Sequence, residues 1–269
     1  MQQRTYAVTG AASGIGRATA TMLAGKGARV FALDFNEEGL RALAAQGIAT
    51  IQTDVTSAES VGAAAEAIRA GAEGLDGLVN CAGILVAGAL VELPEADLRR
   101  IMDVNVMGAY RVTRALYPLL EPRRGRVVNV SSEAAYFSAP FNGPYSMSKY
   151  ALEAYSDALR RELALKGMKV AIIQPGPVRT ALLNHTVPEF DRVLAGTKFE
   201  SAMRRIRDLS SREWDKGAEP EEVARAIWHA LTARRPKIRY RVHNDLFRRV
   251  FSVLPDRWAD SVLNRMLKG

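Results

Sequence analysis

The sequence predicts an α/β fold in which one doubly wound, seven-stranded parallel sheet carries helices on both faces. Short runs of β-branched and other apolar residues alternate with longer amphipathic stretches along the chain. The 269 residues are 48% hydrophobic, which is enough for one sizeable core, and no linker-like segment divides them. We therefore expect residues 1–269 to form a single domain.

Seven short runs carry the strand pattern, and a helical stretch separates each from the next, as a parallel sheet requires. The runs lie at residues 5–9, 29–33, 49–53, 75–80, 126–131, 169–174 and 237–242. Asp54, Thr56 and Ser57 can each cap the helix that runs to Ala70. Two longer helices are expected at 94–120 and 145–165.

The first strand ends in a glycine-rich turn, and the helical run from Arg17 to Gly25 follows directly. Glycines let the backbone turn tightly and approach a pyrophosphate, while the helix start offers free N–H groups and a positive dipole end. The strand before this Gly-x-x-x-Gly-x-Gly turn and the helix after it are typical of a dinucleotide-binding Rossmann fold. The predicted contacts in the turn are Gly10, Ser13, Gly14, Ile15 and Gly16.

Tyr145 and Lys149 lie four residues apart, so a helix places the phenol and the ammonium group on one face. A positive charge beside a phenol favours the phenolate, so we expect Lys149 to lower the pKa of Tyr145 from its ordinary value of about 10. Ser132 follows the strand at 126–131, and the carboxyl ends of parallel strands border the ligand crevice. Ser132 and Tyr145 are therefore expected to meet at one sheet edge as a proton-transfer site.

In their order and spacing, these features resemble the short-chain dehydrogenase/reductase family, and most of all its hydroxysteroid and retinol dehydrogenase members. The resemblance covers essentially the whole chain. Its motifs are Thr9 with the glycine turn, Asn80-Cys81-Ala82-Gly83, Asn105, Ser132, Tyr145 with Lys149, and Pro175-Gly176-Pro177-Val178-Arg179-Thr180. Cys81 departs from the family, which more often has a second Asn there, and we interpret the exchange as neutral.

The resemblance implies an oxidoreductase that moves a hydride between nicotinamide and a secondary alcohol or ketone. It makes Tyr145 the general acid/base and lets Ser132 hydrogen-bond the substrate oxygen. Lys149 would hold the nicotinamide ribose, and Asn105, in a kinked helix, would support a water relay to Lys149. The other implied cofactor contacts are Asp54 and Val55 at the adenine, Val178 and Thr180 at the carboxamide, and Asn80, Ala82, Gly83, Pro175 and Gly176.

Charge at the end of the second strand favours NAD over NADP. Asp34 stands eighteen residues after Gly16, where a carboxylate can accept hydrogen bonds from the adenosine ribose and repels a 2′-phosphate. Ser13 and Phe35 stand where NADP-preferring relatives usually carry a basic residue. Arg17 lies near enough to keep NADP as the alternative, and a solvated loop carboxylate is the other interpretation of Asp34.

Residues 181–215 follow the Pro-Gly segment and are expected to form a lid over the substrate. Their apolar residues are Leu182, Leu183, Val187, Phe190, Val193, Leu194, Phe199, Met203 and Ile206. An apolar lid, with Phe137 and Phe141 as aromatic walls, predicts a lipophilic substrate of steroid-, retinoid- or long-chain type, although a surface helix pair shows a similar pattern. The alternative is an NADP-dependent carbonyl or 3-oxoacyl reductase, and the non-enzymatic alternative is a dinucleotide-binding sensor or scaffold.

Residues 244–269 form a basic, amphipathic C-terminal extension. From Arg234 onward, ten Lys or Arg against three Asp supply +7 of the formal charge of +8. Apolar residues recur at helical spacing on either side of Pro255, namely Leu246, Val250 and Leu254, then Trp258, Val262 and Met266. Such helices pack on the domain or on another subunit, or they lie on anionic lipid as a peripheral membrane contact. No nucleic acid is expected as a partner, because no reading module accompanies the charge.

One cysteine among 269 residues excludes an intramolecular disulfide and is typical of a reducing compartment. The N-terminal segment lacks the apolar stretch of a signal or membrane span, so we expect a cytoplasmic protein, peripheral to a membrane if the extension binds lipid. His185, His229 and His243 show no metal-ligand spacing, so no metal site is expected. Family members usually pair through the helices expected here at 94–120 and 145–165, which implies a homodimer or homotetramer.

Overall fold

The computed structural model describes residues 3–180, 190–191 and 193–268, and the seven expected strands form one sheet in it. The strand order is β3-β2-β1-β4-β5-β6-β7, and every neighbouring pair is parallel. The winding reverses between β1 and β4, which makes the sheet doubly wound with its switch point there. The strands are β1 Thr5–Thr9, β2 Arg29–Asp34, β3 Ala49–Gln52, β4 Gly77–Asn80, β5 Arg126–Val130, β6 Lys169–Pro175 and β7 Arg239–Val242.

The helices follow the expected order along the chain. Those described are α1 Gly14–Gly25, α2 Glu37–Ala44, α3 Ala58–Gly71, α4 Glu95–Met102, α5 Ala109–Leu120, α6 Gly143–Ala164, α8 Glu200–Asp215, α9 Pro220–Thr232, α10 Leu246–Phe251 and α11 Asp256–Lys268. A 3₁₀ turn at Glu133–Ala135 follows β5 and precedes α6.

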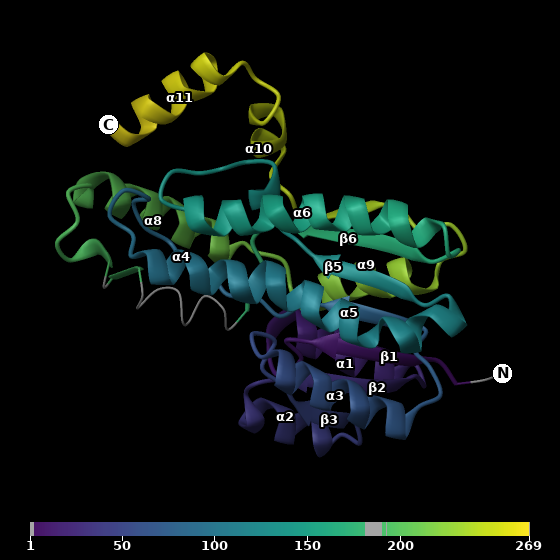
Figure 1. Cartoon of the computed structure of the whole chain (residues 1–269). Coiled ribbons are helices and arrows are strands. Elements are labelled where there is room, and N and C mark those ends of the chain that lie inside the picture. The colour runs from purple at the N-terminus through teal and green to yellow at the C-terminus, as the bar shows by residue number, and fades with distance from the viewer. Residues whose placement is uncertain (1–2, 181–189, 192, 269) are drawn as a thin grey trace.

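Two hydrophobic cores hold helices against the two faces of the sheet. One core joins the sheet to α1, α2 and α9 through side chains such as Leu23 and Ile227. The other joins it to α3, α5 and α6 through side chains such as Ile68, Leu116 and Leu163. In Figure 1, α5 and α6 lie in front of the strands and α9 lies behind them. Because full burial of one such side chain contributes about 1.5–3 kcal/mol, the strand ends that border the site have a rigid base.

The helix expected at 94–120 is kinked, and a π-helical turn causes the kink. The turn spans Asp103–Gly108 and joins α4 to α5. Asn105 lies inside it and is only 1% exposed. Gly108 ends the turn against Val55, because a Cβ at Gly108 would lie 2.8 Å from Val55 Cγ2. The wide turn therefore buries Asn105 and lets α5 approach the segment after β3.

The C-terminal extension forms two helices separated at Pro255, as the sequence predicts. Asp245 caps α10 by accepting a hydrogen bond from the Phe247 N–H at 2.6 Å. Figure 1 shows α11 standing away from the sheet, and α11 contacts α8. Within the described part of the chain, no helix is both long and apolar enough to span a membrane. The exposed apolar side chains of the extension are Leu246, Phe247, Val250, Val253, Trp258 and Val262.

Candidate active site

A cavity of about 1590 Å³ opens at the carboxyl ends of the strands, beside the switch point between β1 and β4. The glycine turn, the segments after β4, β5 and β6, and the first turns of α6 all line it. The predicted site residues in this lining are Gly10, Ser13, Gly14, Ile15, Gly16, Asp34, Asp54, Val55, Ala82, Gly83, Ser132, Tyr145, Lys149, Pro175, Gly176, Val178 and Thr180. Asn80 and Asn105 are predicted site residues that are not part of it.

The glycine turn brings backbone segments closer together than any side chain allows. A Cβ at Gly16 would lie 2.0 Å from the Gly10 carbonyl oxygen. Gly10 has a φ of +65°, and a Cβ there would lie 2.8 Å from Ala82 Cα. Gly14, at the start of α1, has a φ of +50°. The turn is therefore built from residues that only glycine can supply.

Thr9 connects the ends of the two strands at the switch point. Its Oγ1 accepts hydrogen bonds from the backbone N–H groups of Cys81 at 3.0 Å and Ala82 at 3.1 Å. The same hydroxyl lies 3.5 Å from the carbonyl oxygen of Val79, to which it donates. The Asn80-Cys81-Ala82-Gly83 motif is thus held against the glycine turn by one side chain.

Asp34 lies at the end of β2 beside the glycine turn. Its carboxylate accepts from the Ala12 N–H at 2.9 Å and from the Asn36 N–H at 2.9 Å. Each carboxylate oxygen keeps further acceptor capacity for a ligand in the cavity. Arg17 is exposed and does not line the cavity, whereas Phe35 is 73% exposed and does.

Asp54 shapes the loop after β3, and Ser57 caps the helix. Asp54 Oδ1 accepts from the Thr56 N–H at 2.8 Å and from the Thr56 hydroxyl at 2.7 Å. The Ser57 side chain accepts from the Ser60 N–H at 3.1 Å and so caps α3. Of the three capping candidates, Ser57 is therefore the cap, and Asp54 with Val55 remains in the cavity lining.

Ser132, Tyr145 and Lys149 meet on one wall of the cavity. The Ser132 hydroxyl is hydrogen-bonded to the Tyr145 phenol, and Ser132 Oγ also accepts from the Ala134 N–H at 3.2 Å. Lys149 Nζ lies 5.5 Å from the centre of the Tyr145 ring. It donates to the carbonyl oxygen of Val130 at 3.0 Å. Helix α6 and the end of β5 thus bring a hydroxyl, a phenol and an amine together.

Burial dominates the protonation of these groups. It raises the pKa of Tyr145 to about 12, and the hydrogen bond with Ser132 acts in the lowering direction. Burial also lowers the pKa of Lys149 to about 8, while Cys81 and Glu153 act to raise it. Our expectation that Lys149 lowers the Tyr145 pKa is therefore wrong in this structure. The cause is physical: the amine is held at the Val130 carbonyl, and desolvation of the phenol outweighs its charge.

Asn105 connects the π-helical turn to the segment after β4 and to α6. Its Oδ1 accepts from the Ile84 N–H at 2.8 Å, and its Nδ2 donates to the Ile84 carbonyl oxygen at 3.0 Å. Nδ2 also donates to Ser148 Oγ at 2.9 Å. Gly83 lies close to both Asn105 and Lys149, since its Cβ would be 3.3 Å from Asn105 Oδ1 and 3.7 Å from Lys149 Nζ. Asn105 thus borders the lysine without contacting the cavity itself.

Asn80 belongs to a buried polar network beneath the site. Its Nδ2 donates to Thr113 Oγ1 at 3.0 Å and to Asn129 Oδ1 at 2.8 Å. Asn129 in turn donates to Ser156 Oγ at 2.8 Å. The Asn80 side chain, which is 5% exposed, therefore joins β4 to β5 and α5 and does not face the cavity.

Aromatic and aliphatic side chains line another part of the cavity. Phe141 packs against Phe199, with ring centres 5.9 Å apart. Phe190, Leu194 and Met203 are buried in a small core together with Ala87. Leu182, Leu183 and Val187, which belong to the predicted apolar lid, lie outside the described residues. The apolar lining residues are Leu85, Ala87, Phe137, Phe141, Phe190 and Ile206.

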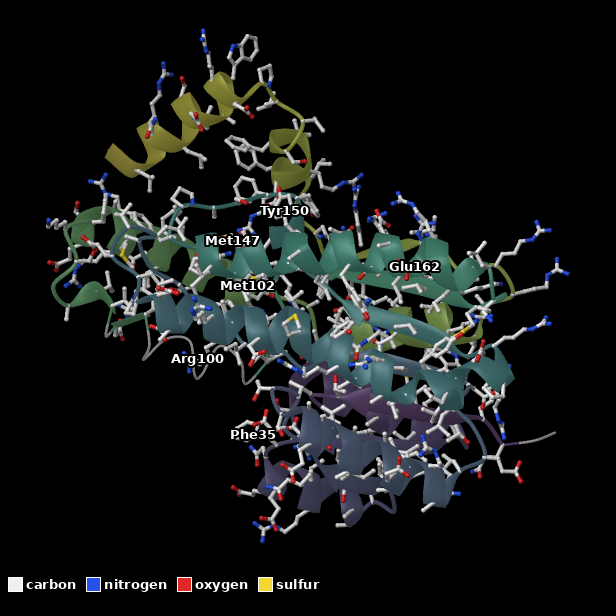
Figure 2. The ribbon with its side chains drawn as sticks, in the orientation of Figure 1. Phe35, Arg100, Met102, Met147, Tyr150 and Glu162 are labelled. Carbon is white, nitrogen blue, oxygen red and sulfur yellow. The ribbon has the colours of Figure 1, made fainter. Side chains whose placement is uncertain are left out.

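Three charged residues in the cavity lining were not predicted from the sequence. Arg100 lies on α4, and Figure 2 shows its side chain on the same side of the molecule as Phe35. Glu133 follows Ser132 directly and forms an ion pair with Arg248 of α10. An acidic residue beside a predicted catalytic serine could have signalled Glu133. No local pattern links it to an arginine 115 positions later.

The histidines have structural partners. The ring of His229 is hydrogen-bonded to Tyr240 Oη at 2.8 Å, and that of His243 to the Lys216 carbonyl oxygen at 3.0 Å. His185 lies outside the described residues. Within those ranges, no three His, Cys, Asp or Glu side chains gather into a metal-binding group.

Comparison with known proteins identifies relatives along the whole chain. The family model of the short chain dehydrogenases matches residues 4–190. Mouse retinol dehydrogenase 7 is 36% identical over 98% of this chain and 88% of its own length. Human retinol dehydrogenase 16 is 39% identical over 87% of this chain and 78% of its own. Human 17-beta-hydroxysteroid dehydrogenase type 6 is 35% identical, with coverages of 98% and 89%.

Solved structures with the same fold agree with these relatives. A short-chain dehydrogenase from Streptomyces avermitilis is 29% identical, with a TM-score of 0.76 over 99% of this chain and 96% of its own. A short chain dehydrogenase/reductase from Burkholderia phymatum, in complex with NAD, is 26% identical, with a TM-score of 0.73 over 88% and 89%. The resemblance found in the sequence is thereby confirmed. The chain belongs to the short-chain dehydrogenase family and is a nicotinamide-dependent oxidoreductase that acts on CH–OH groups.

Proposed function

We propose that this enzyme transfers a hydride between NAD and a lipophilic secondary alcohol or ketone, with Tyr145 as the general acid/base. The observation that carries the proposal is the meeting of Ser132, Tyr145 and Lys149 in the cavity that the glycine turn also lines. A hydroxyl and a phenol that already touch can hold one alcohol or carbonyl oxygen between two hydrogen bonds.

The glycine turn suits the pyrophosphate of a nicotinamide dinucleotide. The close approach at Gly10 and Gly16 leaves backbone, with no side chain, facing the ligand. The Ser13 side chain makes no capping hydrogen bond to α1, which leaves the first N–H groups of the helix to a bound anion. Thr180, Val178 and the other lining residues after β6 would hold the nicotinamide end.

The bound nicotinamide ring would supply the hydride chemistry, and the residues of this chain would handle the proton. With its pKa near 12, the Tyr145 phenol is protonated at neutral pH and can donate to a carbonyl oxygen during reduction. In oxidation the same oxygen would take the hydroxyl proton back. Ser132 would orient the substrate oxygen, and Lys149, buried at the base of this wall, would hold the nicotinamide ribose.

Asp34 supports a preference for NAD over NADP. Its carboxylate is fixed by the Ala12 and Asn36 N–H groups at the edge of the glycine turn. A 2′-phosphate at this place would meet a negative charge, and the neighbouring Phe35 offers it no positive one.

The apolar lining supports a lipophilic substrate. Phe137, Phe141 and Phe190 line the cavity, and Phe190 is buried with the described part of the predicted lid. The named relatives are retinol and hydroxysteroid dehydrogenases, whose names denote substrates of the same apolar kind. We propose residues 181–215 as the lid that covers such a substrate.

A coenzyme and substrate screen tests the proposal. The purified protein is offered NAD or NADP with 2-decanol, a hydroxysteroid, retinol or, in the reverse direction, a 3-oxoacyl thioester, and reduced nicotinamide is followed by absorbance. We expect NAD-linked oxidation of a lipophilic alcohol. NADP-linked reduction of the thioester would instead support the carbonyl or 3-oxoacyl reductase, and dinucleotide binding without any turnover would support the sensor or scaffold.

We also propose a homodimer or homotetramer that forms through the long helices. Large apolar side chains are exposed on them: Met107, Tyr110, Met147 and Tyr150 are between 40% and 45% exposed. Figure 2 shows Met147 and Tyr150 along α6. Sedimentation of the wild type and of Met147→Arg tests this. A wild type that sediments as a monomer would contradict it.

The extension supports peripheral membrane contact as a second proposal. Val253 is 80% exposed and Trp258 is 68% exposed, and arginines such as Arg249 and Arg257 accompany them. We expect the protein to sediment with phosphatidylserine vesicles, and Val253→Glu with Trp258→Glu to abolish this. Leu165→Glu is the matched control, because Leu165 is 87% exposed at the end of α6. Equal loss in the control would contradict an extension-specific contact.

A further inference from the structure

The extension reaches into the active site through α10. Phe251 of α10 packs edge-on against Phe137, with ring centres 5.4 Å apart. The Asn244 side chain, just before α10, donates to Tyr136 Oη at 2.8 Å. Arg248 lies 5.8 Å from the centre of the Phe137 ring and forms an ion pair with Glu133. These contacts all fall on the segment that follows Ser132.

The Glu133–Arg248 ion pair is the buried part of this junction. Glu133 is 5% exposed, and the side chain of Arg248 is 20% exposed. Arg248 Nη1 contacts Glu133 Oε1, while Glu133 Oε2 is buried without a hydrogen-bond partner in the described structure. A carboxylate in such a place is costly unless a cation compensates it, so removal of the arginine would leave the segment strained.

Glu133 is joined directly to Ser132 and begins the 3₁₀ turn that the Ser132 side chain caps. A shift of Glu133 therefore moves the serine hydroxyl that contacts Tyr145. We propose that Arg248 is a positioning residue for catalysis: by pairing with Glu133, helix α10 fixes the Ser132 hydroxyl at the reacting oxygen. This inference rests on the proposed role of Ser132, and it gives a family-unlike part of the chain, its basic extension, a defined task in the active site.

The charged surroundings of Glu133 make this role testable by pH. From α10 the group in contact with Glu133 is Arg248, and Arg241 of β7 lies over the neighbouring Tyr136 ring, 5.4 Å from its centre. From α6, Tyr145 and Lys149 line the same cavity, as does Cys81 after β4. Without the Arg248 charge, the buried Glu133 carboxyl would have its pKa raised by about 3–5 units and would become protonated near neutral pH.

The test compares Arg248→Met with Arg249→Met, the same exchange at the exposed neighbour on α10. With the alcohol that turns over best in the screen, we expect Arg248→Met to lower kcat by about 10- to 100-fold at alkaline pH. Its activity should recover as the pH falls and Glu133 becomes neutral, and NADH affinity should stay within about twofold. Glu133→Gln combined with Arg248→Met should regain activity at alkaline pH, and Arg249→Met should match the wild type.

Hydrogen exchange gives a readout that needs no turnover. We expect faster amide exchange across residues 132–142 in Arg248→Met and an unchanged rate in Arg249→Met. Wild-type activity of Arg248→Met at every pH, or no rescue by the added Glu133→Gln, would overturn the positioning role. Those results would leave the proposed function intact, because only full activity of Tyr145→Phe would contradict the acid/base assignment.

Discussion

Gly16→Ala is the sharpest test of the dinucleotide site, because its effect can be worked out from the backbone alone. The added Cβ would lie 2.0 Å from the Gly10 carbonyl oxygen and 2.6 Å from its carbon. Nonbonded heavy atoms settle at about 3.5–4.0 Å, so the turn must open by more than about 1 Å. Both partners are backbone, and neither can rotate away as a side chain can.

The expected cost follows from that displacement. Overpacking of this kind costs about 1–3 kcal/mol, and each kcal/mol lowers the Tm of a chain of this size by about 2–4 °C. The N–H groups meant for the pyrophosphate move with the turn, so the Kd for NADH should rise by about tenfold or more, which is about 1.4 kcal/mol.

Gly25→Ala is the matched control on the same helix. A Cβ at Gly25 would have no atom within 4 Å, and the residue has no positive φ. Its Tm should stay at the wild-type value or rise slightly, with unchanged NADH affinity. NADH fluorescence titration and thermal unfolding measure both quantities. Wild-type NADH affinity in Gly16→Ala would refute the assignment of this turn to the pyrophosphate.

Three further predictions concern the catalytic wall and the coenzyme. Tyr145→Phe should abolish turnover and leave NADH binding nearly intact; measurable kcat at the wild-type level would remove Tyr145 from the proton path. Asp34→Ala should raise kcat/KM with NADP relative to NAD by about tenfold, and an unchanged ratio would mean that the carboxylate does not meet the ribose. Lys149 releases its proton near pH 8 when folded and near 10.5 when unfolded, so between these values the unfolded chain binds more protons and stability rises with pH. Lys149→Met should remove a slope of up to about 1.4 kcal/mol per pH unit in urea unfolding, and a constant difference from the wild type across this range would contradict it.

Local signals in the sequence were sufficient for the sheet, the glycine turn and the meeting of Ser132 with Tyr145. Each depends on short-range spacing: a strand followed by glycines, or two side chains on one helical face. The Tyr145 pKa could not be predicted in this way, because it depends on how deeply the phenol is buried, and a four-residue spacing carries no information on depth.

Two other features depended on contacts between distant parts of the chain. Asn80 belongs to the motif after β4, yet its side chain points into a network with Thr113 and Asn129, on elements whose packing no motif specifies. Arg248 reaches Glu133 only because α10 folds back over the end of β5. A prediction from sequence alone would need that tertiary placement first.

The π-helical turn at Asp103–Gly108 has a consequence for how this chain can change in length. Each residue of an α-helix turns the axis by about 100°, so loss of one residue from the turn would regularise the helix but rotate everything after it. Val112, Leu116 and Leu119 of α5 would then leave the sheet, although their identities are unchanged. This helix should therefore tolerate many substitutions on its outer face and almost no single-residue insertion or deletion.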